Sequence, residues 1–217
     1  MNEIVIQKMC KKSFEPVVKR IDQLLKEKDE YILVAIDGKC AAGKTTLAYY
    51  LKELYKCNVF HMDDFFLQMQ QRTVERFNEV GGNIDYERFK EEVLKFIIQK
   101  KDVIYRPFSC KTLNFQEAKI MEFHRLNIIE GSYSQHPYFG NVYHLRVFLD
   151  IPEDLQIARI RFRNGERMLE RFKNEWIPKE NEFFLKYDIR RQSLIINNSI
   201  CYKEEMKDLV TCRNNNR

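Results

Sequence analysis

The residues whose types and spacing carry chemistry most directly lie between positions 38 and 46. Gly38 and Gly43 are separated by four residues, and Lys44 and Thr45 follow at once. Small residues let the backbone curl so that its N–H groups point at phosphate oxygens. We expect Lys44 to contact the outer phosphates of a nucleotide and the Thr45 hydroxyl to coordinate magnesium. The residues expected to bind the nucleotide are Gly38, Lys39, Cys40, Ala41, Ala42, Gly43, Lys44, Thr45 and Thr46.

The segments on either side must place this loop between a strand and a helix. Residues 32–36 are an apolar run of the length of a buried strand. After the loop, apolar residues at positions 47, 50, 51 and 54 share one helical face. A chance match in a turn is the alternative. The strand–loop–helix context confirms the pattern, and the N-terminus of the helix adds a positive dipole end for a phosphate.

Two adjacent carboxylates follow the next expected strand, residues 57–61. Asp63 and Asp64 stand there, followed by Phe65 and Phe66. In open α/β sheets, ligands bind at the carboxyl ends of the strands. Acids at that end suit a general base or a metal contact beside an aromatic wall. The alternative is an N-cap aspartate followed by core phenylalanines, and the position after a strand favours the functional interpretation.

A third buried strand, residues 126–130, ends in Glu130. In phosphate-loop proteins an acid at this place orients magnesium or its water shell. We therefore expect Glu130 and Thr45 to form the metal site. His136 follows in a loop with no second histidine nearby, which favours a structural role.

Arginines are concentrated after the fourth expected strand, residues 143–150. They are Arg159, Arg161, Arg163, Arg167 and Arg171. A run of charges is usually the solvated face of a helix. This run follows a strand of a phosphate-binding sheet, and guanidinium forks match phosphate oxygens. We favour a lid that neutralises charge during phosphoryl transfer.

Three further residues are candidates for contacting an acceptor. Asp85 is the natural N-cap of a helix that runs to about residue 99, and a capping carboxylate can still direct its other oxygen at a sugar hydroxyl. Tyr105 and Arg106 lie on the first strand of an expected hairpin, residues 102–108 and 119–123. Both could reach a ligand, and packing within the sheet is the alternative.

The rest of the chain is expected to form one domain. Its expected parts are a strand or arm over 1–10, an N-terminal helix over about 13–28 capped by Ser13, a core over about 30–197 with a mobile polar loop at 67–83, a helical stretch over 168–190 broken near Pro178, a fifth strand over 193–196, and a C-terminal helix and tail over 198–217 with the helix at Lys203–Val210.

Composition excludes several classes. Of 217 residues, 44% are hydrophobic and 32% charged, which is typical of a globular protein. The sequence contains no run of 18 apolar residues, so we expect no membrane span. The N-terminus has no signal-peptide pattern, and the six cysteines form no C-x-x-C pair, so we expect a cytoplasmic protein with reduced thiols. A net charge of +5 is mild. Nucleic-acid binding through residues 159–173 would require the arginines to face away from the phosphate loop.

Together these motifs resemble the uridine kinase-like group of phosphate-loop kinases, which includes uridine–cytidine kinases, nicotinamide riboside kinases and phosphoribulokinases. The matching pieces are residues 36–46, 61–66, 83–86, 129–131 and the arginine-rich helix after Asp150. The resemblance implies an α/β fold with a five-stranded parallel sheet in the order 2-3-1-4-5, flanked by helices, with a small β-hairpin over the acceptor site and an Arg-rich lid. Members of the group are often oligomers, so a homo-oligomer is possible.

The resemblance also implies roles for individual residues. Asp63 is the base that takes the proton of the acceptor hydroxyl, Asp85 binds ribose hydroxyls, and Phe66 lines the acceptor side. Thr45 and Glu130 hold Mg²⁺. The residues of the lid on the phosphates are Arg159, Arg163 and Arg167.

Two departures concern the acceptor. The uridine kinase pattern has a histidine shortly after the first hairpin strand, whereas residues 105–111 contain none. The lid reads Asn164-Gly-Glu-Arg167 in place of an Arg-Gly-Arg ending. Both departures leave the ATP-binding half intact.

The leading hypothesis is therefore a kinase that uses ATP and Mg²⁺ to phosphorylate a hydroxyl of a small molecule, with the 5′-hydroxyl of a nucleoside such as uridine as first candidate. The alternatives are a nicotinamide riboside-type or other non-pyrimidine small-molecule kinase, and a non-catalytic ATP-binding regulatory module. The presence of Asp63 and Glu130 disfavours the module, since a switch needs no base. A signalling GTPase is disfavoured because the guanine-reading Asn-Lys-x-Asp motif is absent.

Overall fold

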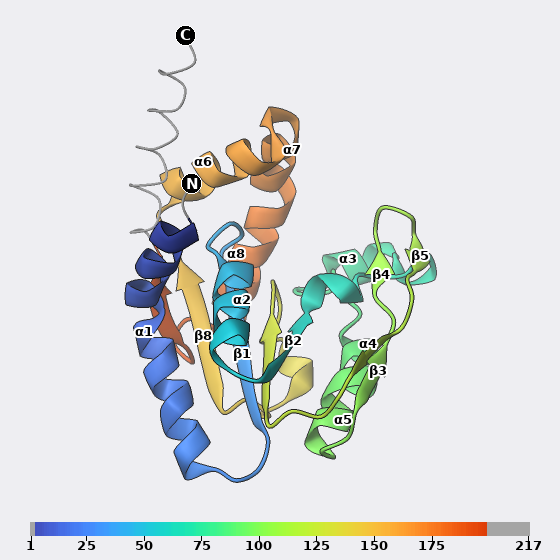
Figure 1. The fold of residues 1–217 in the computed structure, drawn as a ribbon. Coiled ribbons are helices and arrows are strands. Elements are labelled where there is room, and N and C mark those ends of the chain that lie inside the picture. The colour runs from blue at the N-terminus through green and yellow to red at the C-terminus, as the bar shows by residue number, and fades with distance from the viewer. Residues whose placement is uncertain (1–2, 199–217) are drawn as a thin grey trace.

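A computed structural model describes the backbone of residues 3–198 and the side chains of residues 12–198 (Figure 1). Its centre is a five-stranded sheet in the order β2-β7-β1-β8-β9, in which every neighbouring pair is parallel. Counted within this sheet alone, the order is 2-3-1-4-5, as expected. The strands are β1 (Ile32–Gly38), β2 (Cys57–His61), β7 (Leu126–Glu130), β8 (Leu145–Asp150) and β9 (Leu194–Asn197).

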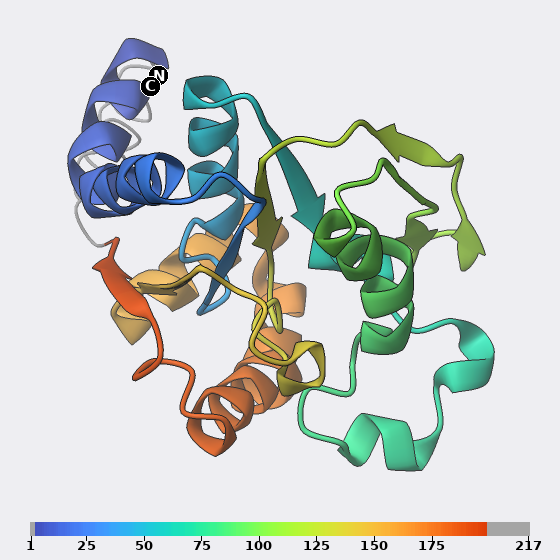
Figure 2. The same cartoon turned by 90° about the horizontal axis from the view of Figure 1, so that it is seen from below.

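Helices cover both faces of this sheet, which explains why β1 and β7 are buried along their whole length. On one face lie α1 (Glu3–Glu27) and α2 (Lys44–Leu54), and on the other lie α8 (Ile177–Lys186) and a helix formed by α4 (Tyr86–Phe89), a π-helical turn at Lys90–Leu94 and α5 (Lys95–Ile98) (Figure 2). Each face has its own apolar core. Phe14, Leu47 and Val147 belong to the first core, and Phe89, Phe148 and Phe183 belong to the second.

The N-terminal segment differs from the expectation. Residues 1–10 were expected to form a strand or arm, but α1 begins at Glu3, so Ser13 lies inside the helix and does not cap it. Phe14, Val17 and Ile21 are buried along one side of α1, and the pairing of this stripe with the sheet stabilises the longer helix. Pro16 lies on the exposed side, where the carbonyl that loses its donor can be hydrated.

Residues 62–124 form a lobe beside the open edge of β2 (Figure 1). The expected hairpin is present as β3 (Val103–Tyr105) and β6 (Lys119–Met121), and its long connection carries a second small pair, β4 (Phe108–Ser109) and β5 (Asn114–Phe115). The lobe also contains the helix formed by α4 and α5 described above, and the short helices η1 (Met62–Phe65), η2 (Met69–Gln71) and α3 (Val74–Asn78).

The segment 67–83, expected to be a mobile loop, is anchored by Arg76. The Arg76 guanidinium donates to the carbonyls of Gly82 and Ile84 and to the carboxylate of Glu87, and it stacks over the Tyr86 ring at 3.9 Å. These contacts tie the segment to the start of the following helix, because one side chain satisfies a carbonyl of the segment, the Ile84 carbonyl and the Glu87 carboxylate.

A lid crosses the carboxyl ends of the strands (Figure 1). It consists of α6 (Glu153–Asn164), α7 (Glu166–Arg171) and a π-helical turn at Phe172–Trp176 that leads into α8. The break expected near Pro178 is absent, because Pro178 lies in the first turn of α8, where no backbone donor is needed, and the wide turn before it ends with Ile177 N–H donating to Phe172 O.

Two further observations complete the fold. A one-turn helix, η4 (Pro137–Phe139), follows β7. Among the described residues, no helix has the length and apolar character needed to cross a membrane. The expected C-terminal helix, Lys203–Val210, lies outside the described residues.

Candidate active site

The phosphate-binding loop connects β1 to α2 at the carboxyl edge of the sheet (Figure 1). Gly38 has a φ of +133°, and a Cβ there would lie 2.2 Å from the carbonyl oxygen of Leu149 on the neighbouring strand β8. Gly43 has a φ of +96° at the start of α2. Glycine is therefore required at Gly38 by backbone conformation and by close packing against β8.

Side chains from three elements fix the carbonyl groups of this loop. Lys44 Nζ donates to Gly38 O at 2.6 Å and to Lys39 O at 3.2 Å. Arg159 from the lid donates to Ala41 O at 3.1 Å, and Asn198, just after β9, donates to Ala42 O at 2.8 Å. Two cations thus lie against the loop, as charge compensation of a phosphate requires.

A buried carboxylate from the lid also contacts the loop. Glu180 on α8 accepts from the backbone N–H of Cys40 at 2.9 Å and from the Ser132 hydroxyl at 2.5 Å. Only 5% of Glu180 is exposed. This side chain connects α8, the phosphate loop and the segment after β7, so the position of the lid helix is tied to the loop.

Asp37, the residue before Gly38, is fully buried at the end of β1. Its carboxylate accepts from the backbone N–H groups of Gly38 at 2.8 Å and Gln135 at 3.2 Å. Burial raises the pKa of Asp37 to about 7, and the charge of Lys44 and the two hydrogen bonds oppose this shift. Asp37 joins the phosphate loop to the segment after β7.

Thr45 and Glu130, the expected metal ligands, lie together. The Thr45 hydroxyl is 3.3 Å from Oε1 and 3.2 Å from Oε2 of Glu130. The described residues contain no cluster of three or more His, Cys, Asp or Glu side chains able to hold a metal. A hydroxyl and one carboxylate still fit Mg²⁺, which proteins bind with one or two carboxylates while phosphates and water complete the octahedron.

His61 is a third member of this group. His61 and Glu130 are register partners across the β2–β7 pair, and His61 Nδ1 lies 2.5 Å from Glu130 Oε1. The hydrogen bond to Glu130 raises the pKa of His61, while partial burial opposes the shift. The imidazole thus contacts the carboxylate expected to hold the metal.

Asp63 and Asp64 have different surroundings although they are adjacent. Asp63 keeps an exposed surface, yet the surrounding protein removes much of its hydration, and this desolvation raises the pKa of Asp63. The charge of Glu130 raises that pKa further, and the charges of Lys44 and His61 oppose the rise. Asp64 accepts from Tyr105 Oη and from Lys119 Nζ, each at 2.8 Å. Asp63 therefore faces the phosphate loop, and Asp64 holds the hairpin.

The other expected acceptor residues are placed as follows. Phe66 is half-buried and bridges to Ile84. Asp85 is buried and caps α4 by accepting from Arg88 N at 3.1 Å. Tyr105 is buried with its hydroxyl on Asp64, and Arg106 is exposed with its guanidinium 4.6 Å from the Phe115 ring centroid. Tyr105 and Arg106 thus have partners inside the hairpin lobe.

A cavity of about 170 Å³ lies between the segment after α3 and the helix α8. Its lining includes Asn83, Tyr133, Lys179 and Glu182. Asn83 precedes Ile84, the bridge partner of Phe66, and Tyr133 follows Glu130 by three positions, so the cavity adjoins the carboxyl edge of the sheet. A cavity of about 150 Å³ is enough for a benzene ring, so this one can take a ring-sized group.

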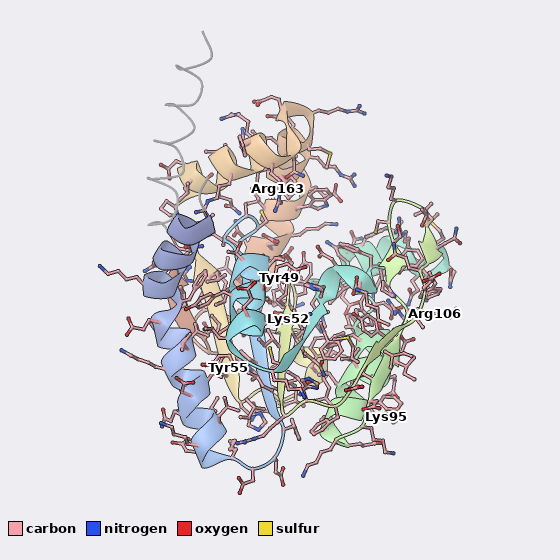
Figure 3. All side chains as sticks on the ribbon, viewed as in Figure 1. Tyr49, Lys52, Tyr55, Lys95, Arg106 and Arg163 are labelled. Atoms are coloured by element: carbon pink, nitrogen blue, oxygen red, sulfur yellow. The ribbon has the colours of Figure 1, made fainter. Side chains whose placement is uncertain are left out.

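The three lid arginines differ in their contacts. Arg159 reaches Ala41 of the phosphate loop, as described above. Arg163 and Arg167 are exposed, and Figure 3 shows Arg163 on the lid above the phosphate loop, far from Arg106 in the hairpin lobe. Arg161 and Arg171 pair with Glu166 and Glu175 on the solvent side. The structure brings Arg159 to the loop, whereas Arg163 and Arg167 are exposed on the lid.

Four residues of this site were not assigned roles from the sequence. They are Asp37, His61, Glu180 and Asn198. Asp37 lies directly before the phosphate loop and His61 lies two positions before Asp63. Their positions at the ends of expected strands were the sequence feature from which a role in the site could have been predicted. Glu180 and Asn198 are separated from the loop residues they contact by 140 and 156 positions, and no local pattern marks them. Cys40 and Cys57 are buried free thiols and Cys110 is an exposed one.

Comparison with known proteins gives a likeness of fold. No family model matches the chain, and no curated protein matches it significantly. Among solved structures, a possible uridine kinase from Bacillus stearothermophilus superimposes with a TM-score of 0.61 at 19% identity, over 83% of this chain and 99% of that chain. The YGR205w protein superimposes with a TM-score of 0.59 at 13% identity, over 88% of this chain and 94% of that chain. The expected resemblance to the uridine kinase-like group is confirmed at the level of the fold.

Proposed function

We propose that this protein is a kinase that uses ATP and Mg²⁺ to phosphorylate a hydroxyl group of a small molecule. The observation that carries the proposal is the convergence of the phosphate loop, the Thr45–Glu130 pair and Asp63 at one edge of the sheet. A protein that only bound nucleotide would not need a base such as Asp63 at this edge of the sheet. The fold shared with a possible uridine kinase supports the same conclusion.

Each group has a part in the reaction. The loop N–H groups and Lys44 would bind the phosphates, and Thr45 and Glu130 would hold Mg²⁺, which would supply positive charge to them when bound. Asp63 accepts the hydrogen bond of the acceptor hydroxyl and takes its proton as the phosphoryl group transfers. Arg159, with Arg163 and Arg167 on the lid, stabilises the charge on the transferred group.

The acceptor we favour is a nucleoside, with its 5′-hydroxyl at Asp63. Its ring-sized base would occupy the cavity beside Tyr133, and Asp85 and Phe66 would lie on the sugar side. The lining of that cavity includes Lys179 and Glu182 and no hairpin residue. The hairpin also lacks the histidine of the uridine kinase pattern, since residues 105–111 contain none. A non-pyrimidine acceptor, such as nicotinamide riboside, is therefore the second candidate. A non-catalytic ATP-binding module is the third.

The test is ADP release from ATP and Mg²⁺ against a panel of nucleosides, nicotinamide riboside and small sugars, with Asp63→Asn in parallel. Stimulation by one compound that disappears in Asp63→Asn supports the kinase and identifies its acceptor class. A wild-type protein that binds ATP tightly and releases no ADP with any panel compound would favour the non-catalytic module. Absence of ATP binding would refute the proposal as a whole.

A further inference from the structure

We infer that His61 is a positioning residue for the metal site: it orients the Glu130 carboxylate so that this carboxylate and the Thr45 hydroxyl can hold Mg²⁺ together. The inference rests on the proposed function and extends it to a residue outside the phosphate-loop, Asp63 and lid motifs. His61 would affect the affinity of the site for Mg²⁺ and would not contact the reacting atoms.

Strand register places His61 and Glu130 together. The two residues are partners across adjacent parallel strands, so their side chains leave the sheet on the same face. The contact of 2.5 Å between His61 Nδ1 and Glu130 Oε1 is the shortest that Glu130 makes among the described residues, compared with 3.2 and 3.3 Å to Thr45. The Nδ1–H group of His61 is therefore the main restraint on the rotation of Glu130.

The imidazole is itself held in place. Its ring lies 6.0 Å from the ring of Tyr49, which is one helical turn after Thr45 on α2 (Figure 3). His61 thus lies between the helix that carries Thr45 and the strand that carries Glu130. The imidazole thus contacts a residue of each element that carries an expected ligand, through the ring of Tyr49 and the carboxylate of Glu130.

A packing role alone does not explain this arrangement. The His61 side chain is 23% exposed and lies at the end of β2, so it adds little to the apolar core, whereas Glu130 is 6% exposed and needs a partner for its charge. In metal sites, hydrogen bonds from neighbouring side chains orient ligating carboxylates, and their loss reduces metal affinity by about 10- to 100-fold. His61 has the position and the donor for this role.

The experiment measures equilibrium binding of ATP at increasing Mg²⁺ concentration and in EDTA, with no acceptor present. Chelation of Mg²⁺ by free ATP is equal for all variants, so a difference between variants reports the protein. His61→Phe is expected to need about tenfold more Mg²⁺ for half-maximal tightening, while its ATP binding in EDTA equals that of wild type. His61→Asn retains a donor near the Nδ1 position and is expected to stay within about threefold of wild type.

Two controls keep the result interpretable. His124→Phe makes the same change at a half-exposed histidine whose ring contacts the Glu122 carbonyl, and it is expected to leave the Mg²⁺ midpoint unchanged. In a Glu130→Gln background, His61→Phe is expected to have no further effect, because its influence acts through the carboxylate. Retained ATP binding in EDTA shows that each variant is folded.

The outcomes separate the two proposals. A wild-type protein that binds ATP but whose His61→Phe variant has the wild-type Mg²⁺ midpoint refutes the role of His61 and leaves the kinase proposal intact. Equal losses in His61→Asn and His61→Phe would also refute it, because the hydrogen bond would not be the cause. If His61→Phe does not bind ATP in EDTA, His61→Ala, which also lacks the donor, takes its place, and a wild-type Mg²⁺ midpoint in His61→Ala refutes the role of His61. If the wild type binds no ATP, both proposals fail.

Discussion

Asp63 and Asp64 show how neighbouring side chains of the same type take different roles. Asp64 has two protein donors and serves the hairpin, whereas Asp63 lies among Lys44, His61 and Glu130. Replacing Asp63 with Asn removes the proton acceptor and keeps the shape. We expect Asp63→Asn to lower kcat by at least about 10²-fold while ATP affinity stays nearly unchanged. Single-turnover phosphorylation and ATP titration measure the two quantities, and unchanged turnover would remove Asp63 from the mechanism.

Asp37 makes the stability of the fold depend on pH. Burial raises the pKa of Asp37 to about 7 from 3.8, so the folded protein keeps a proton that the unfolded chain loses between about pH 4 and pH 7. The contribution of Asp37 to stability therefore falls as pH rises through that window and levels off above about pH 7. The full change is about 4 kcal/mol at most.

Thermal unfolding from pH 4 to pH 8 tests this dependence. The Asp37→Asn variant does not titrate at this position, so its Tm should change less with pH between 4 and 7 than that of wild type. Asp154→Asn, on the exposed first turn of α6, should not flatten the profile. Parallel profiles for wild type and Asp37→Asn would contradict the assignment.

The lid and the helix α8 that continues it contact the phosphate loop through several polar groups, since Gln156 and Arg159 of α6 donate to the carbonyls of Cys40 and Ala41, and Glu180 of α8 accepts from the Cys40 N–H. Glu180 connects α8 to Cys40 N–H and to Ser132, and the small apolar core of Cys40, Ile160 and Leu169 lies beside it. Removing the carboxylate leaves the Cys40 N–H without its acceptor. The lid and the loop should then open more often, because local opening costs less when a buried hydrogen bond is lost.

Hydrogen exchange measures this opening. In Glu180→Ala we expect the Cys40 amide to exchange about tenfold faster, with faster exchange along α8 as well. Glu182→Ala, an exposed acid on the same helix, serves as the matched control and should leave both rates unchanged. Equal protection of Cys40 in wild type and Glu180→Ala would show that the Glu180 carboxylate does not limit the opening of the loop and that its other contacts hold it.

In the molecule as a whole, two apolar cores lie on opposite faces of one sheet. A substitution that weakens the packing on either face should therefore destabilise the whole domain. Phe14 on α1 is completely buried against the face that α2 also covers. Phe14→Ala should reduce the free energy of unfolding by about 3–5 kcal/mol. Unfolding should remain a single transition, as expected for one domain.

Denaturant unfolding followed by far-UV circular dichroism and by Trp176 fluorescence tests both statements. Lys19→Ala on the same helix removes only an exposed ion pair with Glu15 and should change stability by less than about 1 kcal/mol. Two separated transitions would show that the N-terminal helix and the sheet do not form one cooperative unit.

Several parts of this protein could be predicted from local patterns. The phosphate loop, the strands around it and the positions of Asp63 and Glu130 follow from residue spacing and from the rule that parallel strands end at one edge. The hairpin followed from the alternating polarity of residues 102–108 and 119–123, whereas the order of the sheet followed from the resemblance to a known group of kinases. The full length of α1 did not follow, because its buried stripe acquires a partner only when the helix packs on the sheet.

The contacts that complete the site depend on long-range packing. His61 meets Glu130 because two strands pair in one register, and Glu180 and Asn198 reach the phosphate loop from 140 and 156 residues away along the chain. A local pattern reports which face of an element is apolar but carries no information on which distant side chain will face it. The residues proposed to bind phosphate can therefore be recognised in the sequence, whereas those that hold the loop, the proposed metal ligand and the lid in place can be recognised only when the strands are paired and the lid is packed.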